Sequence, residues 1–116
     1  MANLIGDIEW YRGDSYPLEL TIKNKETKVI IDLTGYAFSL TVDTLQDPPD
    51  DTTQVFEVPG VLDIDPTLGR VSFTPTVLQT AIDAKGYFYD VQMTDSSGNI
   101  RTIVKNKWKI LQDITK

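Results

Sequence analysis

Hydrophobic and polar residues alternate along most of this chain, and turn-forming residues interrupt the alternation at short intervals. Successive side chains of a β-strand point to opposite faces, so a period of two predicts strands with one buried face. The last alternating run is the longest, with three lysines on one face and, on the other, Val104, Asn106, Trp108 and Ile110. Short strands separated by turns are typical of a small all-β domain, and one buried face per strand favours a sandwich.

The alternation and the turn residues together place nine candidate strands. Thr44–Thr53 holds two prolines and several aspartates, so we expect an exposed loop there, and Pro59-Gly60 is expected to turn between two short strands. The pattern predicts an antiparallel β-sandwich of about seven to nine strands. The candidates are Ile8–Arg12, Tyr16–Lys23, Lys28–Asp32, Tyr36–Asp43, Gln54–Val58, Val61–Ile64, Arg70–Thr74, Gly86–Thr94 and Ile100–Ile110.

One segment, Pro75 to about Lys85, has the features of a short helix. Thr74 can cap its start, and a proline fits the first helical position. Leu78 and Ile82 lie four residues apart, on one helical face, and Gly86 can end the helix. We therefore expect one helix, about 75–85, bridging two strands at one end of the sandwich.

Composition limits the chemistry available to the chain. Its 116 residues, 41% of them hydrophobic, fit one domain with one core, so residues 1–116 are read as a single β-sandwich domain. The chain has no cysteine and no histidine. Thiolate catalysis and zinc–thiolate sites are therefore excluded, and the commonest general base and metal ligand is missing. We expect no enzyme activity and no cofactor.

The net charge of −6 is distributed unevenly. Residues 1–100 carry 6 basic and 16 acidic side chains, whereas residues 101–116 carry 5 and 1. An acidic body argues against nucleic-acid binding, because phosphates would repel it. The stripe formed by Lys105, Lys107 and Lys109 is expected to meet an acidic partner, either another protein or another copy of this chain. The alternative is that these lysines keep the protein soluble and protect an exposed edge strand from pairing.

The sequence also indicates where the protein is made. No apolar run approaches the length of a membrane span, so we expect no membrane partner. Residues 1–7 lack the basic region and hydrophobic core of a secretory signal. Together with the missing cysteines, this predicts synthesis in a reducing cytoplasm.

Two short motifs invite a functional interpretation that local structure explains as well. Arg12–Asp14 is the tripeptide that integrins recognise, but Gly13 permits a bend, and Asp14 and Ser15 can cap backbone N–H groups. The aspartates of 47–51, or Asp63 with Asp65, could offer oxygens to calcium. We therefore expect the tripeptide to form a bend. Neither acidic set has EF-hand spacing, so we expect those carboxylates to be solvated.

Aromatic residues supply the remaining candidates for contact. Alternation places Tyr87 and Tyr89 on the core side of their strand, with Phe88 among polar neighbours on the other side. An exposed phenylalanine there would suit an interface, as would Trp10 on a first strand at the edge of a sheet. The candidate contact surface is therefore Lys105, Lys107, Lys109, Phe88 and Trp10.

Four segments occur in an order that resembles a known family. They are Arg12–Ser15, Ile31–Gly35, Gly86–Gln92, and Asp95–Asn99 with its turn into the last strand. This order is similar to that of small immunoglobulin-like domains of tailed bacteriophages, among them the N-terminal domain of the baseplate upper protein. The resemblance extends over roughly Glu9 to Leu111, and its motifs are short and mostly structural.

The resemblance implies an immunoglobulin-like sandwich and a non-enzymatic structural role in a virus particle. It carries over no catalytic, cofactor-binding or metal-binding residue. The implied partners are other virion proteins, with several copies in symmetric positions. The baseplate upper protein continues into a longer assembly, whereas residues 1–116 are expected to form one domain. Tail, baseplate, neck and capsid-surface positions therefore all stay open. The rivals are a virion-surface adhesion or carbohydrate-binding module, using Phe88, Trp10 or Tyr11, and a small enzyme with two carboxylates.

Overall fold

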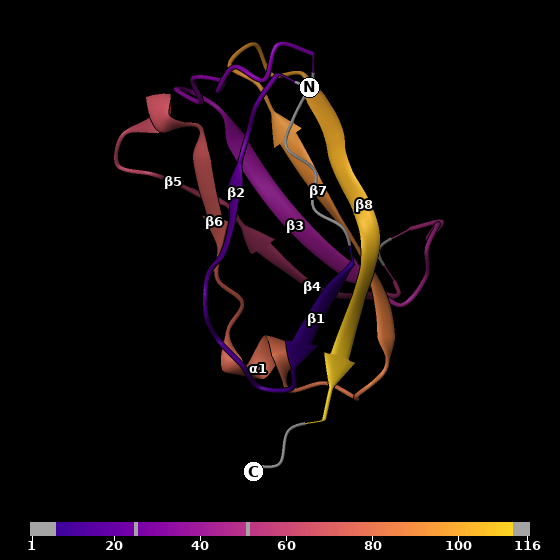
Figure 1. The fold of residues 1–116 in the computed structure, drawn as a ribbon. Coiled ribbons are helices and arrows are strands. Elements are labelled where there is room, and N and C mark those ends of the chain that lie inside the picture. The colour runs from indigo at the N-terminus through magenta and orange to yellow at the C-terminus, as the bar shows by residue number, and fades with distance from the viewer. Residues whose placement is uncertain (1–6, 25, 51, 113–116) are drawn as a thin grey trace.

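The computed structural model describes residues 7–24, 26–50 and 52–112 as a sandwich of two β-sheets (Figure 1). Over these residues, the larger sheet has five strands in the order β1-β8-β7-β3-β4, and the smaller sheet has three in the order β2-β6-β5. The predicted all-β immunoglobulin-like fold is confirmed. The strands are β1 (Ile8–Tyr11), β2 (Leu18–Thr21), β3 (Ala37–Asp43), β4 (Gln54–Pro59), β5 (Val61–Leu62), β6 (Arg70–Phe73), β7 (Gly86–Thr94) and β8 (Ile100–Leu111).

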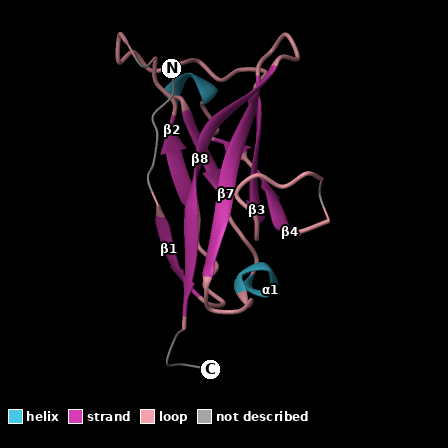
Figure 2. Ribbon diagram, turned by 90° about the vertical axis from the view of Figure 1, so that its right-hand side faces the viewer, coloured by secondary structure: helices cyan, strands magenta, loops and turns pink. Residues whose placement is uncertain are grey.

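Two short helical elements complete the described chain: a 3₁₀ turn, η1 (Pro66–Leu68), and one α-helical turn, α1 (Val77–Thr80). They lie at opposite ends of the sandwich, as Figure 2 shows in cyan. Neither element approaches the length and apolar character that a membrane-crossing helix requires, within the part of the chain that is described.

The core lies between the sheets and follows the alternation in the sequence. In β7 the buried side chains are Tyr87, Tyr89, Val91 and Met93, as predicted. Trp108 of β8 is fully buried and meets Phe56 and Tyr89 edge-to-face, with ring centroids 6.0 and 5.8 Å away. Aromatic rings favour this arrangement, so the centre of the core is an aromatic cluster.

The predicted strand Lys28–Asp32 is wrong. This segment forms only an isolated bridge between Lys23 and Ile30. The side-chain oxygen of Asn24 accepts hydrogen bonds from the backbone N–H groups of Glu26 and Thr27, and Lys28 takes a positive φ of 63°. The turn chemistry of asparagine therefore outweighs the strand preference of the valine and isoleucines that follow.

The turn expected at Pro59-Gly60 is a crossing between sheets, because β4 belongs to the larger sheet and β5 to the smaller one. The N–H of Gly60 donates to the carbonyl of Phe38 at 2.8 Å. A Cβ on Gly60 would lie 2.7 Å from the Phe38 Cβ and 2.8 Å from a Val71 methyl carbon. Glycine is needed here because the backbone passes so closely over the core.

The helix expected over about 75–85 is only a single turn, and its cap is Thr76 rather than Thr74. Thr76 and Gln79 form a capping box, in which each side chain accepts a hydrogen bond from the other residue's backbone N–H. The turn ends at Ala81, whose ψ of 54° is not helical. The apolar helix face predicted from Leu78 and Ile82 does not form, since Leu78 is 85% exposed.

Two further features are characteristic of immunoglobulin-like sandwiches. The hydroxyl of Tyr87, at the start of β7, donates to the carbonyl of Asp83 at 2.9 Å, which is the arrangement called a tyrosine corner. Strand β1 pairs in parallel with β8, from Ile8 opposite Trp108 to Tyr11 opposite Leu111. This pairing makes β8 an inner strand of the larger sheet along that stretch.

Candidate functional site on the outer face of the larger sheet

The outer face of the larger sheet brings the lysine stripe beside Phe88. Lys105, Lys107 and Lys109 are exposed on β8, as predicted. Across the ladder to β7, Lys107 lies opposite Phe88 and Lys105 opposite Asp90. At Lys109, β8 lies between β7 and β1, so protection of an unpaired edge does not explain that lysine.

Each lysine of the stripe lies beside an acidic residue of the same chain. The ammonium of Lys105 is 2.5 Å from a carboxylate oxygen of Asp47. The carboxylate of Asp7 accepts a hydrogen bond from the backbone N–H of Lys107 at 3.3 Å, and Glu9 is the β1 residue in register with Lys109. The stripe is therefore less positive than the sequence indicated, and its power to steer an acidic partner is reduced.

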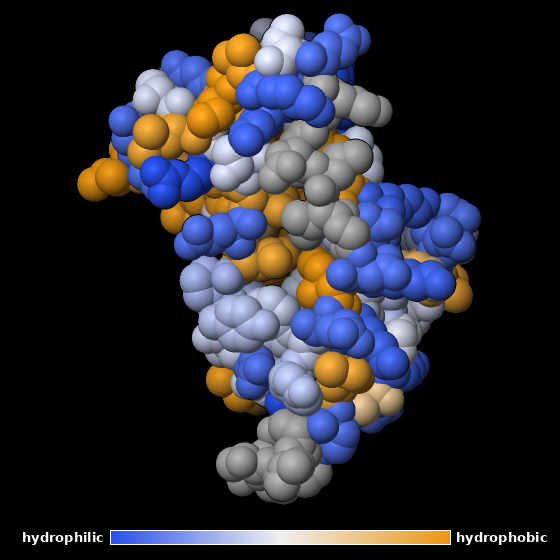
Figure 3. Space-filling model, in the orientation of Figure 1, coloured by the Kyte–Doolittle hydropathy of each residue, from blue (hydrophilic) through white to orange (hydrophobic). Residues whose placement is uncertain are grey.

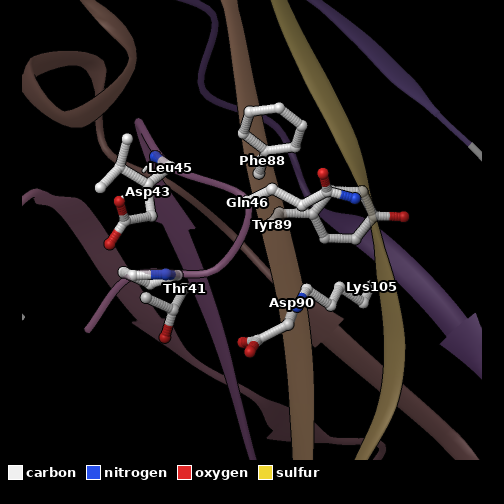
Figure 4. A pocket seen from close by; sticks show the side chains of 9 residues that line it. Thr41, Asp43, Leu45, Gln46, Phe88, Tyr89, Asp90 and Lys105 are labelled. Atoms are coloured by element: carbon white, nitrogen blue, oxygen red, sulfur yellow. Dashed lines mark hydrogen bonds between the residues drawn. The ribbon is translucent and has the colours of Figure 1, made fainter. Parts of the chain in front are cut away.

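Phe88 lies half-buried at the junction of three hollows on this face. The smallest, about 50 Å³, lies between the strands and the loop that carries Leu45 and Gln46 (Figure 4). Another, about 110 Å³, runs between Phe88, Gln46 and the lysines. The largest, about 520 Å³ and hereafter the Gly86 hollow, has among its lining residues Asp7, Glu9, Gly86, Phe88, Lys107 and Lys109.

The loop over 44–53 is fixed to the sheet at its base. Asp43 is only 7% exposed, and its carboxylate accepts hydrogen bonds from the N–H of Leu45 at 2.9 Å and the hydroxyl of Thr53 at 2.7 Å. At the other side of the hollow, Asp47 of the loop reaches Lys105. The loop is thus held at its base and again over β8, so it forms one wall beside Phe88.

Asp90 is the partly buried acid of this face, and its pKa is raised above the ordinary value. Burial is the main cause, because it disfavours the charged carboxylate. Lys105 lowers the pKa in return, whereas the carboxylates of Glu57 and Asp43 raise it further. Burial likewise raises the pKa of Tyr89, on the inner side of the same strand, to about 12.

Trp10 was expected to offer an exposed aromatic ring, and this expectation is wrong. The side chain is 2% exposed. Its ring stacks on Tyr16 at 4.0 Å between centroids, and its indole N–H donates to the carbonyl of Asp14 at 3.0 Å. The segment after β1 folds back over the tryptophan and covers it. Tyr11, on the other face of β1, remains 52% exposed.

The integrin-like tripeptide forms a structural turn. Arg12 donates from Nε to the carbonyl of Ile82 at 2.9 Å, and Gly13 has the positive φ of 85° that favours glycine. The hydroxyl of Ser15 donates to the carbonyl of Pro75 at 3.0 Å, where capping of an N–H group was expected. These contacts hold the turn against α1 and its flanks.

The acidic loops are organised by local turns. Asp50 accepts hydrogen bonds from the N–H and hydroxyl of Thr52, and Asp65 does the same for Thr67. The bonds from Thr52 lower the pKa of Asp50. Asp51 lies outside the described residues. Across the described ranges, no three acidic side chains come together as a metal site would require.

Exposed apolar side chains at the two ends of the molecule were missed by the sequence reasoning. The end that holds η1 exposes Val29, Ile30, Leu68 and the fully exposed Ile64. Figure 3 shows hydrophobic residues gathered at this end, at the upper left of the molecule. The end that holds α1 exposes Val77 and Leu78. The sequence signal was two pairs of adjacent hydrophobic residues, 29–30 and 77–78, because each pair breaks the alternation.

The comparisons with known proteins concern the fold. No family model matches the chain, and no curated protein matches its sequence. The soluble domain of PmoD from Methylocystis sp. ATCC 49242 (Rockwell) is similar in structure, with a TM-score of 0.51 and 15% identity over 88% of this chain and 76% of that one.

Two other solved structures are similar at lower TM-scores. CopC from Methylosinus trichosporium OB3b has a TM-score of 0.48 and 11% identity, covering 94% of this chain and 89% of its own. The SrpA adhesin R347E mutant from Streptococcus sanguinis has a TM-score of 0.47 and 16% identity, covering 97% of this chain and 56% of its own. Of these three structures, PmoD alone has a TM-score above 0.5, and at 15% identity that likeness supports a β-sandwich fold and says nothing of function.

Proposed function

We propose that this chain is a non-enzymatic structural subunit of a bacteriophage virion that acts through contacts with other virion proteins. The observation that carries the proposal is the exposure of large apolar side chains at both ends of the sandwich. Ile64 is fully exposed beside η1, and Leu78 is 85% exposed on α1. Apolar groups clustered in this way mark protein contacts, and two opposite contact ends suit a subunit placed between neighbours.

The assignment to a virion rests on the resemblance of residues 9–111 to immunoglobulin-like domains of tailed bacteriophages. The immunoglobulin-like sandwich is compatible with that resemblance, and the compared segments contain turns. Gly13 and Gly35 both have positive φ in turns that belong to the compared segments. The outer face of the larger sheet, with Phe88 and the lysine stripe, would supply a lateral contact in addition to the two ends.

Mass spectrometry of purified phage particles tests the assignment directly. The chain should be present in a constant ratio to the major capsid protein, as expected of a subunit in symmetric positions. Detection in the infected-cell lysate together with absence from washed, gradient-purified particles would contradict the proposal.

The lysine stripe can be tested during particle assembly. Lys105→Glu combined with Lys107→Glu reverses two charges on the outer face and should reduce incorporation into particles, because an acidic neighbour would then be repelled. Lys105→Arg combined with Lys107→Arg, which changes the same two positions and keeps both positive charges, is the matched control. Both variants should melt like the wild type, and equal incorporation of all three proteins would leave the stripe with a role in solubility only.

A second candidate function is a virion-surface adhesion or carbohydrate-binding module. The Gly86 hollow favours it, because its volume of about 520 Å³ lies in the range of small-molecule sites and Phe88 forms one wall. A glycan array distinguishes the two candidates. Binding that is lost in Phe88→Ala supports the module, and no binding favours a purely structural role.

A further inference from the structure

We propose that the Gly86 hollow is a binding site for an uncharged sugar unit. The inference rests on the second candidate function and specifies its ligand. Phe88 supplies an aromatic wall, and Gly86 leaves the floor open. A Cβ added at Gly86 would have no heavy atom within 4 Å, so a side chain at this lining position has room to enter the hollow.

The charged groups around the hollow balance one another. Lys107 and Lys109 bring two ammonium groups, and Asp7 and Glu9 bring two carboxylates. In the described part of the chain, neither ammonium forms an ion pair with Asp7 or Glu9, although the Asp7 carboxylate accepts the backbone N–H of Lys107. The hollow thus offers strong donors and strong acceptors without net charge.

This balance selects among classes of ligand. Each hydroxyl of a sugar donates and accepts a hydrogen bond, and one face of a pyranose ring presents C–H groups that can pack on Phe88. An anionic ligand would gain from the lysines but would be repelled by Asp7 and Glu9. The equal numbers of ammonium and carboxylate groups therefore favour a neutral polyhydroxylated ligand over an acidic one.

The backbone at this position is already paired, which disfavours an extended peptide. Gly86 and Phe88 of β7 are in register with Lys109 and Lys107 of β8, and Lys109 is in register with Glu9 of β1. Recognition by strand addition needs unpaired backbone groups at a sheet edge. A ligand lying over this floor meets side chains only, as a sugar in a shallow site does.

The test uses an array that carries neutral hexose and N-acetylhexosamine glycans beside sialylated and uronate-containing ones. The wild-type protein should bind neutral glycans in preference to acidic ones. Titration with the best neutral glycan should shift the ¹⁵N–¹H resonances of Gly86 and Lys109. Gly86→Val places a branched side chain in the hollow without straining the backbone and should weaken binding roughly tenfold or more, as should Phe88→Ala.

Gln92→Val is the matched control, since it places the same side chain on the same strand and face but outside the hollow. It should bind like the wild type, and all three variants should be checked by thermal melting. Absence of neutral-glycan binding, preference for acidic glycans, or unchanged binding by both Gly86→Val and Phe88→Ala would each overturn the inference. None of these results touches the virion assignment, which stands or falls on the composition of purified particles.

Discussion

The two faces of strands β7 and β8 carry different kinds of side chain in different surroundings. On the inner face, Tyr89, Val91 and Trp108 are buried in an aromatic and aliphatic core. On the outer face of the same strands, Phe88 lies beside charged groups, among them Asp90 and the lysines. The side chains of the inner face stabilise the fold by packing. Those of the outer face form a surface of balanced charges around the half-buried ring of Phe88.

This difference separates stability from recognition. A buried aromatic side chain loses many contacts when it is truncated, whereas exposed ion pairs contribute little individually. Changes on the inner face should therefore alter the free energy of unfolding, and changes on the outer face should alter binding. Substitutions on the two faces of these strands test this separation.

Trp108→Ala should have the largest effect. Truncating this fully buried side chain should lower the free energy of unfolding by about 3–5 kcal/mol, because it opens a cavity at the centre of the aromatic cluster. Lys107→Ala, one residue away on the outer face, should change it by about 0.5 kcal/mol or less. Denaturant unfolding measures both, and similar losses would contradict the distinction between the faces.

Trp108→Phe separates packing from hydrogen bonding at the same position. Within the described chain, the buried Nε1 of Trp108 has no hydrogen-bond partner. Phenylalanine keeps most of the ring contacts and removes this unpaired donor, whose burial costs about 1–3 kcal/mol. Trp108→Phe should therefore lose much less stability than Trp108→Ala.

Tyr87→Phe should have an intermediate effect. It removes the hydroxyl that donates to the Asp83 carbonyl but leaves the buried ring in place. A net hydrogen bond of this kind contributes about 0.5–1.5 kcal/mol, so the loss in unfolding free energy should fall in that range. Thermal melting is a sufficient measurement, and an unchanged melting temperature would show that the corner does not stabilise the sandwich.

Asp90→Asn should have the smallest effect, and that effect should depend on pH. Burial raises the pKa of Asp90 above its usual 3.8, so the folded protein holds this proton more tightly than the unfolded chain does. The stabilising contribution is present below pH 3.8 and is lost as the pH rises through the folded-state pKa. Asparagine has no such loss.

The stability of Asp90→Asn relative to wild type should therefore be higher at neutral pH than at about pH 3, by about 0.5 kcal/mol or less. Paired denaturation curves at the two pH values measure the change. A relative stability that falls as the pH rises would mean that the pairing with Lys105 outweighs the burial of the carboxylate.

Alternation in the sequence was sufficient to predict the strands that cross the middle of the core. Strand β7 and the burial of its residues 87, 89, 91 and 93 follow directly from the period of two. Elsewhere, local interactions outweighed the alternation. A turn at Asn24 lies where a strand was predicted, and the capping pair Thr76 and Gln79 starts the helix later than expected. Gly60 gave no sign in the sequence that it passes between sheets, because that depends on Phe38 and Val71 far along the chain.

The site was less accessible to sequence reasoning than the fold. The outward direction of Lys107 and Phe88 follows from alternation, but the acidic residues beside the lysines come from distant segments. They are Asp47 of the loop, Asp7 before β1 and Glu9 on β1. Trp10 was misassigned because only the fold brings Tyr16 back to cover it. Side-chain direction is a local property of a strand, whereas exposure and charge balance depend on which distant segments lie alongside.

The parallel pairing of β1 with β8 has a mechanical consequence. The two strands run in the same direction over four paired positions (Figure 1). Tension applied to the segment before β1 and the segment after β8 pulls the strands past each other along their length. The inter-strand bonds of the pair then share the load, instead of opening one after another as in a hairpin pulled from its ends. Under such tension, the β1–β8 pair would be loaded in shear along the strands.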